Sequence, residues 1–117
     1  MKNVIKTTLL FLAAVYAFNL HAQAPQKFSY QAVVRNSSNA LVTNTPVSVK
    51  ISLLQGSATG ATIYVETHTV TANANGLITF MIGGGNVTTG TFSTIAWGTA
   101  GPFFIQMETD PAGGSNY

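Results

Sequence analysis

Cysteine is absent from this chain of 117 residues, so neither a disulfide framework nor a lipid-modified cysteine is available to it. Charged residues are scarce as well: they make up 7% of the chain, against about 25% in typical globular domains. Basic clusters of the kind that bind nucleic acid are missing, and histidine occurs only twice. Solubility must therefore come from threonine, serine, asparagine and glutamine, and few groups remain for acid–base or metal chemistry.

The first 22 residues have the pattern of a signal peptide. Lys2 and Lys6 supply a positive start, and an apolar run over residues 9–18 follows that is too short to span a bilayer. Ala22 then offers a small residue at a cleavage site. We therefore expect a signal-peptide helix over residues 1–22 and export to the periplasm, the cell surface or the medium. We expect no transmembrane span after cleavage.

Cleavage would also change the charge of the protein. The formal net charge of +2 includes Lys2 and Lys6, whereas residues 23–117 balance three basic residues against three acidic ones. A net charge near zero only weakly opposes contact between copies of a protein. The composition thus favours self-association or contact with other protein chains, and it gives no reason to expect a nucleic-acid partner.

Short runs of alternating apolar and polar residues, broken by turn residues, predict an all-β fold. We expect a single antiparallel β-sandwich of immunoglobulin-like or transthyretin-like appearance. The expected strands cover residues 27–36, 47–53, 61–72, 77–82 and 103–109, with a short edge strand at 41–42.

The cleanest alternation lies in the second of these runs. One face there is apolar and the other polar, which predicts a strand buried on one face only. The apolar residues are Val47, Val49, Ile51 and Leu53, and the polar ones are Ser48, Lys50 and Ser52.

Two connections carry information of their own. Asn73-Ala74-Asn75-Gly76 predicts a tight turn, because Asn-Gly tolerates positive φ angles, and we expect residues 77–82 to pair back as a hairpin. The longer connection, residues 86–101, contains Phe92, Ile95 and Trp97, which should cover one end of the sandwich.

Several ordered blocks of the sequence resemble one known kind of module. They are Phe28–Asn36, Val47–Gly56, Tyr64–Thr71, Asn73–Leu77, Ile82–Gly85 and Asp110–Gly114. Together they are similar to the N-terminal module of large exported proteins from Bacteroidetes, which often continue into collagen-like repeats, tail-fibre-like stalks or secretion-sorting domains.

That resemblance covers nearly all of residues 23–117. In such proteins the module runs on into a further strand-like segment and a Pro-Tyr-Ala motif, which this chain does not reach. The resemblance therefore implies a β-sandwich module over residues 23–117 that is incomplete at its C-terminal end, with one edge of the core open.

Candidate chemistry is limited to a few residues. Glu66 and His68 share one face of a strand, but a zinc site needs at least three protein ligands, so we interpret both as part of an exposed polar face. Gly83-Gly84-Gly85 lacks the Lys-Ser/Thr of a P-loop and is interpreted as a flexible strand exit. We expect no catalytic residue, no metal site and no cofactor, and hence no enzyme.

Aromatic side chains remain as candidates for contact with a ligand or a partner. Most such residues lie in protein cores, but when exposed on one surface they stack on sugar rings or anchor a protein. The candidates are Tyr30, Tyr64, Trp97, Phe103 and Phe104.

These observations favour a non-enzymatic structural or assembly module of a secreted or cell-surface protein of fibre-like or adhesin-like type. It would contact other chains, or itself, through an open β-edge. Two alternatives remain. One is a carbohydrate-binding module that uses the exposed aromatics on surface glycans, and the other is an accessory domain of a larger secreted enzyme.

Overall fold

The computed structural model describes residues 1–4 and 26–117, so the expected signal peptide lies almost wholly outside the described residues. The described residues form six strands and, after the fifth, a short 3-10 helix, η2 (Phe92–Thr94). Within the described ranges, no helix is long and apolar enough to cross a membrane. The strands are β1 (Phe28–Val33), β2 (Pro46–Gln55), β3 (Ala61–Thr71), β4 (Leu77–Ile82), β5 (Asn86–Thr89) and β6 (Phe103–Asp110).

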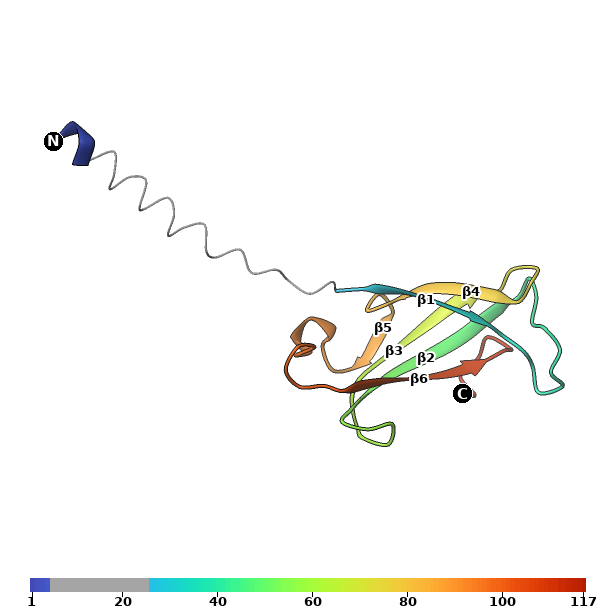
Figure 1. Ribbon diagram of the computed structural model, residues 1–117. Helices are drawn as coiled ribbons and strands as arrows, with labels where there is room; N and C mark the ends of the chain where they lie inside the picture. Colours follow the sequence, from blue (N-terminus) through green and yellow to red (C-terminus); the bar gives the residue numbers. More distant parts are fainter. Residues whose placement is uncertain (5–25) are drawn as a thin grey trace.

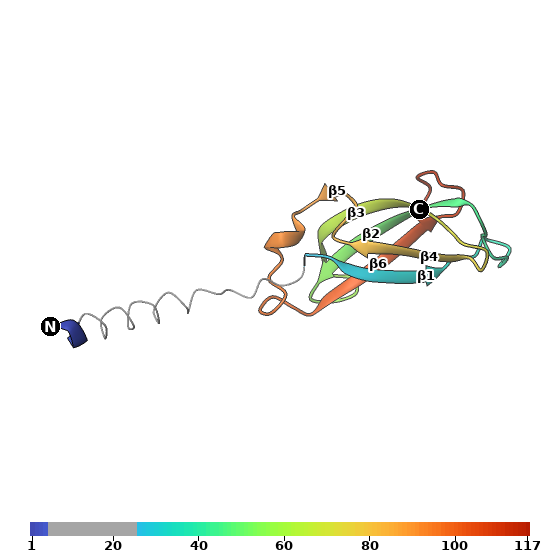
Figure 2. The ribbon, with the colours of Figure 1, turned by 90° about the horizontal axis from the view of Figure 1, so that it is seen from above.

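The strands make two antiparallel sheets. One sheet pairs β1 with β4, and the other has the order β5-β3-β2-β6. The two sheets pack face to face, as Figures 1 and 2 show from two directions. The predicted all-β sandwich is therefore confirmed, with β2 and β3 at the centre of the larger sheet.

The expected hairpin between β3 and β4 is wrong. The turn itself forms: the Asn73 side-chain oxygen accepts the N–H groups of Asn75 and Leu77, and Gly76 has a φ of 73°. β4 then pairs with β1 in the other sheet, because both edges of β3 are already occupied by β2 and β5. The turn thus carries the chain from one sheet to the other.

The short edge strand expected at residues 41–42 is reduced to one bridge. Leu41 bridges Arg35, and the N–H of Val42 donates to the carbonyl of Val34 at 3.0 Å. This small loop returns the chain along the end of β1 before β2 begins.

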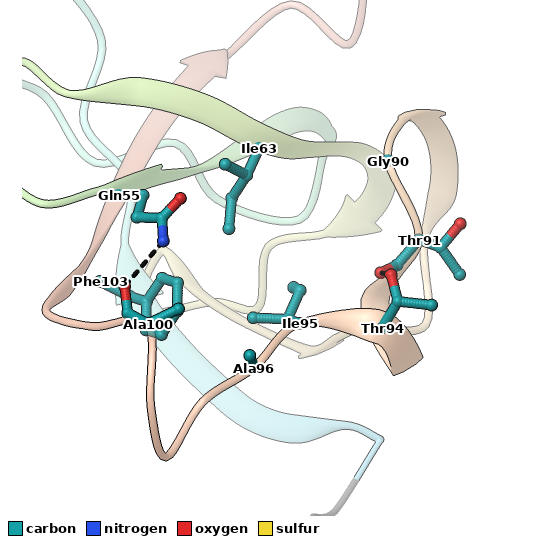
Figure 3. Close-up of a pocket in the computed structure, with 9 residues that line it drawn as sticks. All are labelled: Gln55, Ile63, Gly90, Thr91, Thr94, Ile95, Ala96, Ala100 and Phe103. Carbon is teal, nitrogen blue, oxygen red and sulfur yellow. Dashed lines mark hydrogen bonds between the residues drawn. The ribbon is translucent and has the colours of Figure 1, made fainter.

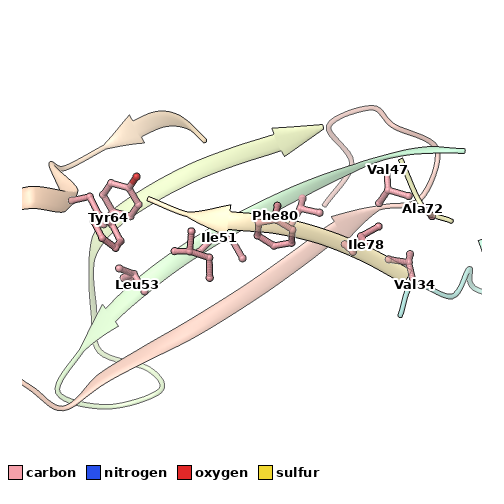
Figure 4. Packing of buried hydrophobic residues seen from close by; sticks show 11 residues of the cluster. Val34, Val47, Ile51, Leu53, Tyr64, Ala72, Ile78 and Phe80 are labelled. Carbon is pink, nitrogen blue, oxygen red and sulfur yellow. The ribbon is translucent and has the colours of Figure 1, made fainter. Parts of the chain in front are cut away.

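The core lies between the two sheets, where side chains of alternate residues meet (Figure 4). The predicted apolar face of β2 is confirmed, since all four of its apolar residues have no exposed surface. The prediction that β2 is buried on one face only is wrong, because Ser48 and Ser52 on the other face are also buried. β2 is a central strand, and its small serines lie between larger side chains of β3 and β6.

Residues after β5 close one end of the sandwich, as expected. Phe92 of η2 is buried, while Ile95 and Trp97 are half-buried and pack against the core. The Phe92 ring centroid lies 5.4 Å from that of Trp97 and 5.3 Å from that of Tyr64. This aromatic packing holds the connection between β5 and β6 against the strands.

Candidate functional site

Glu66 lies in the interior of the sandwich, and its side chain has no exposed surface. It sits on β3 between Tyr64 and His68, and the three side chains share the inward face of the strand because strand residues alternate in direction. Tyr64 is also fully buried, and the side chain of His68 is 9% exposed. The interpretation of Glu66 and His68 as an exposed polar face is therefore wrong.

Four groups donate hydrogen bonds to the Glu66 carboxylate. The Tyr64 hydroxyl donates to Oε2 at 2.6 Å, and His68 Nε2 lies 2.8 Å from Oε1. The backbone N–H of Gly83 lies 2.9 and 3.1 Å from the two oxygens, and that of Gly85 lies 3.2 Å from Oε2. A buried carboxylate needs such compensation, since burial without hydrogen bonds is costly.

The glycines that follow β4 form a cradle for this carboxylate. Gly83 has a φ of 92°, a conformation that residues with a Cβ rarely adopt. A Cβ at Gly85 would lie 2.6 Å from His68 Nε2. The segment Gly83–Gly85 therefore has a defined conformation that places two backbone N–H groups on the Glu66 carboxylate. The interpretation of it as a flexible strand exit is wrong.

The hydrogen bonds decide the charge state of Glu66. Burial on its own would raise the pKa of this carboxyl, but the hydrogen bonds from Tyr64, His68 and the two glycine N–H groups together hold the pKa below its usual value. Burial, with the hydrogen bond to Glu66 and its negative charge, raises the pKa of Tyr64 well above its usual range. At neutral pH the pair is thus a carboxylate with a neutral phenol donor.

This arrangement joins the two sheets. Glu66 belongs to the larger sheet, whereas Gly83 directly follows β4 of the smaller one. His68 adds a second link, because its ring centroid lies 4.6 Å from that of Phe80 on β4. All four donors to Glu66 come from the fold itself, and residues 1–4 and 26–117 hold no group of three or more histidine, cysteine or acidic side chains that could bind a metal ion. The cluster thus links the two sheets through hydrogen bonds to one buried carboxylate.

A second carboxylate, which sequence reasoning missed, organises the turn after β6. Asp110 is buried and accepts the backbone N–H groups of Ala112 and Asn116 at 2.9 and 3.0 Å. The N–H groups of Asn116 and Ala112 lower the pKa of this carboxyl. The sequence Asp-Pro-Ala-Gly-Gly gave the signal, since aspartate often accepts hydrogen bonds from the backbone that follows it.

Trp97 and Phe103 pack against each other, with ring centroids 5.1 Å apart, and the other aromatic candidates lie elsewhere in the fold. Tyr64 is buried in the cluster with Glu66, so the structure excludes it from surface contact. Tyr30 is half-buried on β1 against Phe80, with ring centroids 5.6 Å apart. Trp97 packs against Phe28, Phe92 and Phe103 in tilted or edge-on geometry. Phe104, on β6, is the most exposed of the candidates at 38%.

A pocket of about 300 Å³ opens beside this aromatic group (Figure 3). Ile63, Ile95 and Phe103 give it apolar walls, and Thr91 and Thr94 lie at one side. The Gln55 amide nitrogen, at its edge, donates to the carbonyl of Ala100 at 2.7 Å. The Gln55 amide thus already holds the loop between η2 and β6.

Comparison with known proteins gives one match. No curated protein and no solved structure matches the chain. One family model, described as "Domain of unknown function (DUF8740)", matches residues 29–116, a span that includes five of the six strands completely and nearly all of β1. The chain therefore belongs to the DUF8740 family of domains.

Proposed function

We propose that this β-sandwich is a non-enzymatic structural or assembly module of a secreted or cell-surface protein, fibre-like or adhesin-like in type. The observation that carries the proposal is that the Glu66 carboxylate already accepts hydrogen bonds from four groups of the fold. The most deeply buried acid binds two side chains and two backbone N–H groups of its own fold, so it joins the sheets and is not open to a substrate.

The edges of the sheets supply the contact surface for such a role. Across the described residues, β1 pairs only with β4, and β6 pairs only with β2. An edge strand offers a row of backbone N–H and C=O groups that another chain can pair with. The resemblance to exported Bacteroidetes proteins and the signal-peptide pattern of residues 1–22 support a location outside the cytoplasm.

The arrangement of the aromatics favours this role over carbohydrate binding. A sugar-binding platform needs exposed rings on one surface. Here Tyr64 is buried, and half-buried Trp97 packs against three other rings. Phe104 lies on the opposite face of β6 from Phe103, because neighbouring strand residues point to opposite faces.

The proposal is tested by expressing the full chain in a bacterial host that exports it. We expect mass spectrometry to show removal of residues 1–22, and fractionation to place the product outside the cytoplasm. The product should form defined oligomers or bind other protein chains, and a glycan array should show no binding. A chain that stays in the cytoplasm with Met1–Ala22 attached, or one that hydrolyses a substrate panel, would contradict the proposal.

A further inference from the structure

The outer side of β6 is the longest edge that the larger sheet leaves open. β6 pairs with β2 over eight residues, from Ser48↔Asp110 to Gln55↔Phe103, and no strand in the described part of the chain pairs with its other side. Natural edge strands are normally protected by lysine, proline or a bulge. Residues 103–107 of β6 contain no charged residue and no proline, and their pairing with β2 is regular.

Apolar side chains reach this edge on both faces of the sheet. Phe104 is 38% exposed on one face, and Ile105 is 43% exposed on the other. Their partners on β2, Leu54 and Leu53, are both buried. The apolar layers of the central strand therefore continue to β6, where Phe104 and Ile105 remain partly exposed.

The other strand edges are less suited to pairing. Val33 on β1 and Met81 on β4 are exposed, but each strand exposes a large apolar side chain on one face only. The end of β1 is also closed by the Arg35↔Leu41 bridge. β5 has four residues, and all are exposed. A strand added to β6 would bury apolar surface on both faces at once.

The charges of β6 select the direction of pairing. Its acidic residues, Glu108 and Asp110, lie at one end, while its first five residues are uncharged. Glu108 pairs with Lys50 at 2.7 Å, and the Tyr117 ring lies over the same lysine, 5.4 Å from Nζ. Parallel pairing of two β6 strands would place like charges side by side, which is unfavourable. Antiparallel pairing places the acidic end of one strand beside the uncharged end of the other.

We propose that a second copy of this chain docks on β6, by antiparallel pairing of the two β6 strands across residues 103–107. The pairing joins the two four-stranded sheets into one continuous sheet and covers Phe104 and Ile105 of both copies. The contact is two-fold symmetric, so it closes as a dimer. This inference rests on the proposed assembly function and names its partner.

Sedimentation velocity of the purified protein, over about a hundredfold range of concentration, measures the dimer directly. The test variant is Ile105→Lys, since an inward-facing lysine is a natural means of blocking an edge. The control is Met81→Lys, at a side chain of nearly equal exposure, 44% against 43%, on the other sheet. We expect Ile105→Lys to weaken dimerisation at least about tenfold and Met81→Lys to leave it unchanged.

A second measurement covers the case in which Ile105→Lys fails to fold. The chain lacks cysteine, so Ile105→Cys, at the residue that faces its own copy across the two-fold axis, reports contact between copies without interference. We expect oxidation to link Ile105→Cys chains into dimers at a concentration where Met81→Cys chains stay unlinked. Amide hydrogen exchange should slow at residues 103–107 as the protein concentration rises.

Three results would overturn the inference: a strictly monomeric wild type, a dimer unaffected by Ile105→Lys, or a dimer lost in Val33→Lys, which would place the contact on β1. The proposed function fails on other grounds: the chain is not exported, it turns over a substrate, or it neither oligomerises nor binds another protein chain. A monomer that binds other surface proteins would leave the assembly role in place with a different partner.

Discussion

The Tyr64 hydroxyl donates a 2.6 Å hydrogen bond to Glu66 Oε2, and both side chains are fully buried two residues apart on β3. The same carboxylate receives the backbone N–H of Gly83 at the end of β4, in the other sheet. One charged group thus fixes the contact between two layers that otherwise meet through apolar side chains. Substitutions in this cluster should therefore show their effects in stability.

Replacing Glu66 by glutamine should destabilise the fold by about 2–4 kcal/mol, because hydrogen bonds to a charged group are lost and an amide NH₂ then faces N–H donors. Urea unfolding at neutral pH measures this. The matched control is Glu108→Gln, which breaks the partly exposed pair with Lys50 and should cost less than about 1 kcal/mol. Equal losses for the two variants would show that the Glu66 cluster contributes no more than a surface pair.

The acid dependence of stability should follow from Glu66. Its pKa is lower in the folded protein than its usual value of 4.5, so its contribution is fully present above that value and is lost as pH falls through the folded pKa. We expect the difference in urea midpoint between wild type and Glu66→Gln to shrink as the pH is lowered. Asp110 acts in the same direction, so Glu66→Gln should keep part of the acid slope. A difference that stays constant with pH would contradict the assignment.

Tyr64 should make the stability of the fold decline at alkaline pH. Burial, together with the hydrogen bond to Glu66, raises the pKa of this phenol, so its stabilising contribution is present below its usual value of 10.0 and is lost as pH rises above it. The variant Tyr64→Phe removes the titrating group and should flatten the decline of stability above that pH. Tyr30→Phe, at a half-buried tyrosine of β1, is the control and should keep the decline.

The strands could be predicted because each run of alternation reports which residues share a face. Val47, Val49 and Ile51 are all buried as that pattern indicates. The partner of a strand was not predictable in the same way. The Asn73 side chain forms hydrogen bonds within its own turn, so the local sequence predicts that turn. The pairing of β4 depends instead on which strand edges are already occupied, which the local sequence does not show.

Glu66 was misplaced because a charged residue is normally expected on the surface. The alternation of the strand indicates the correct position, since Glu66 shares its face of β3 with buried Tyr64 and is in phase with buried Ala72, directly after the strand. No local pattern could reveal which groups compensate for burying the charge of Glu66. The donors Gly83 and Gly85 are 17 and 19 residues away along the chain, and they meet Glu66 only once the two sheets have packed.

The glycine cradle gives a prediction of its own. Gly83→Ala should cost at least about 1–3 kcal/mol, since alanine is strained at a φ of 92° and its Cβ would clash with the backbone carbonyl oxygen of Gln26 and lie 3.1 Å from the Phe92 ring. Gly98→Ala is the control, because a Cβ there would meet no atom within 4 Å. Thermal unfolding of both variants decides the point. If Gly83→Ala leaves the unfolding temperature unchanged, the loop can shift without losing its hydrogen bonds to Glu66.

The register of β2 can be tested at two neighbouring positions. Val49 is completely buried between the sheets, so Val49→Asp places a carboxyl in the core and should cost more than about 4 kcal/mol or prevent folding. Lys50 points to the other face, where it pairs with Glu108 at 2.7 Å. Lys50→Asp sets two carboxylates side by side near the surface and should cost about 1 kcal/mol, reduced by added salt. Circular dichroism and urea midpoints of the two variants measure this difference in stability. A shift of one residue would exchange the two faces of the strand. Similar losses of stability at both positions would therefore show that the register is wrong.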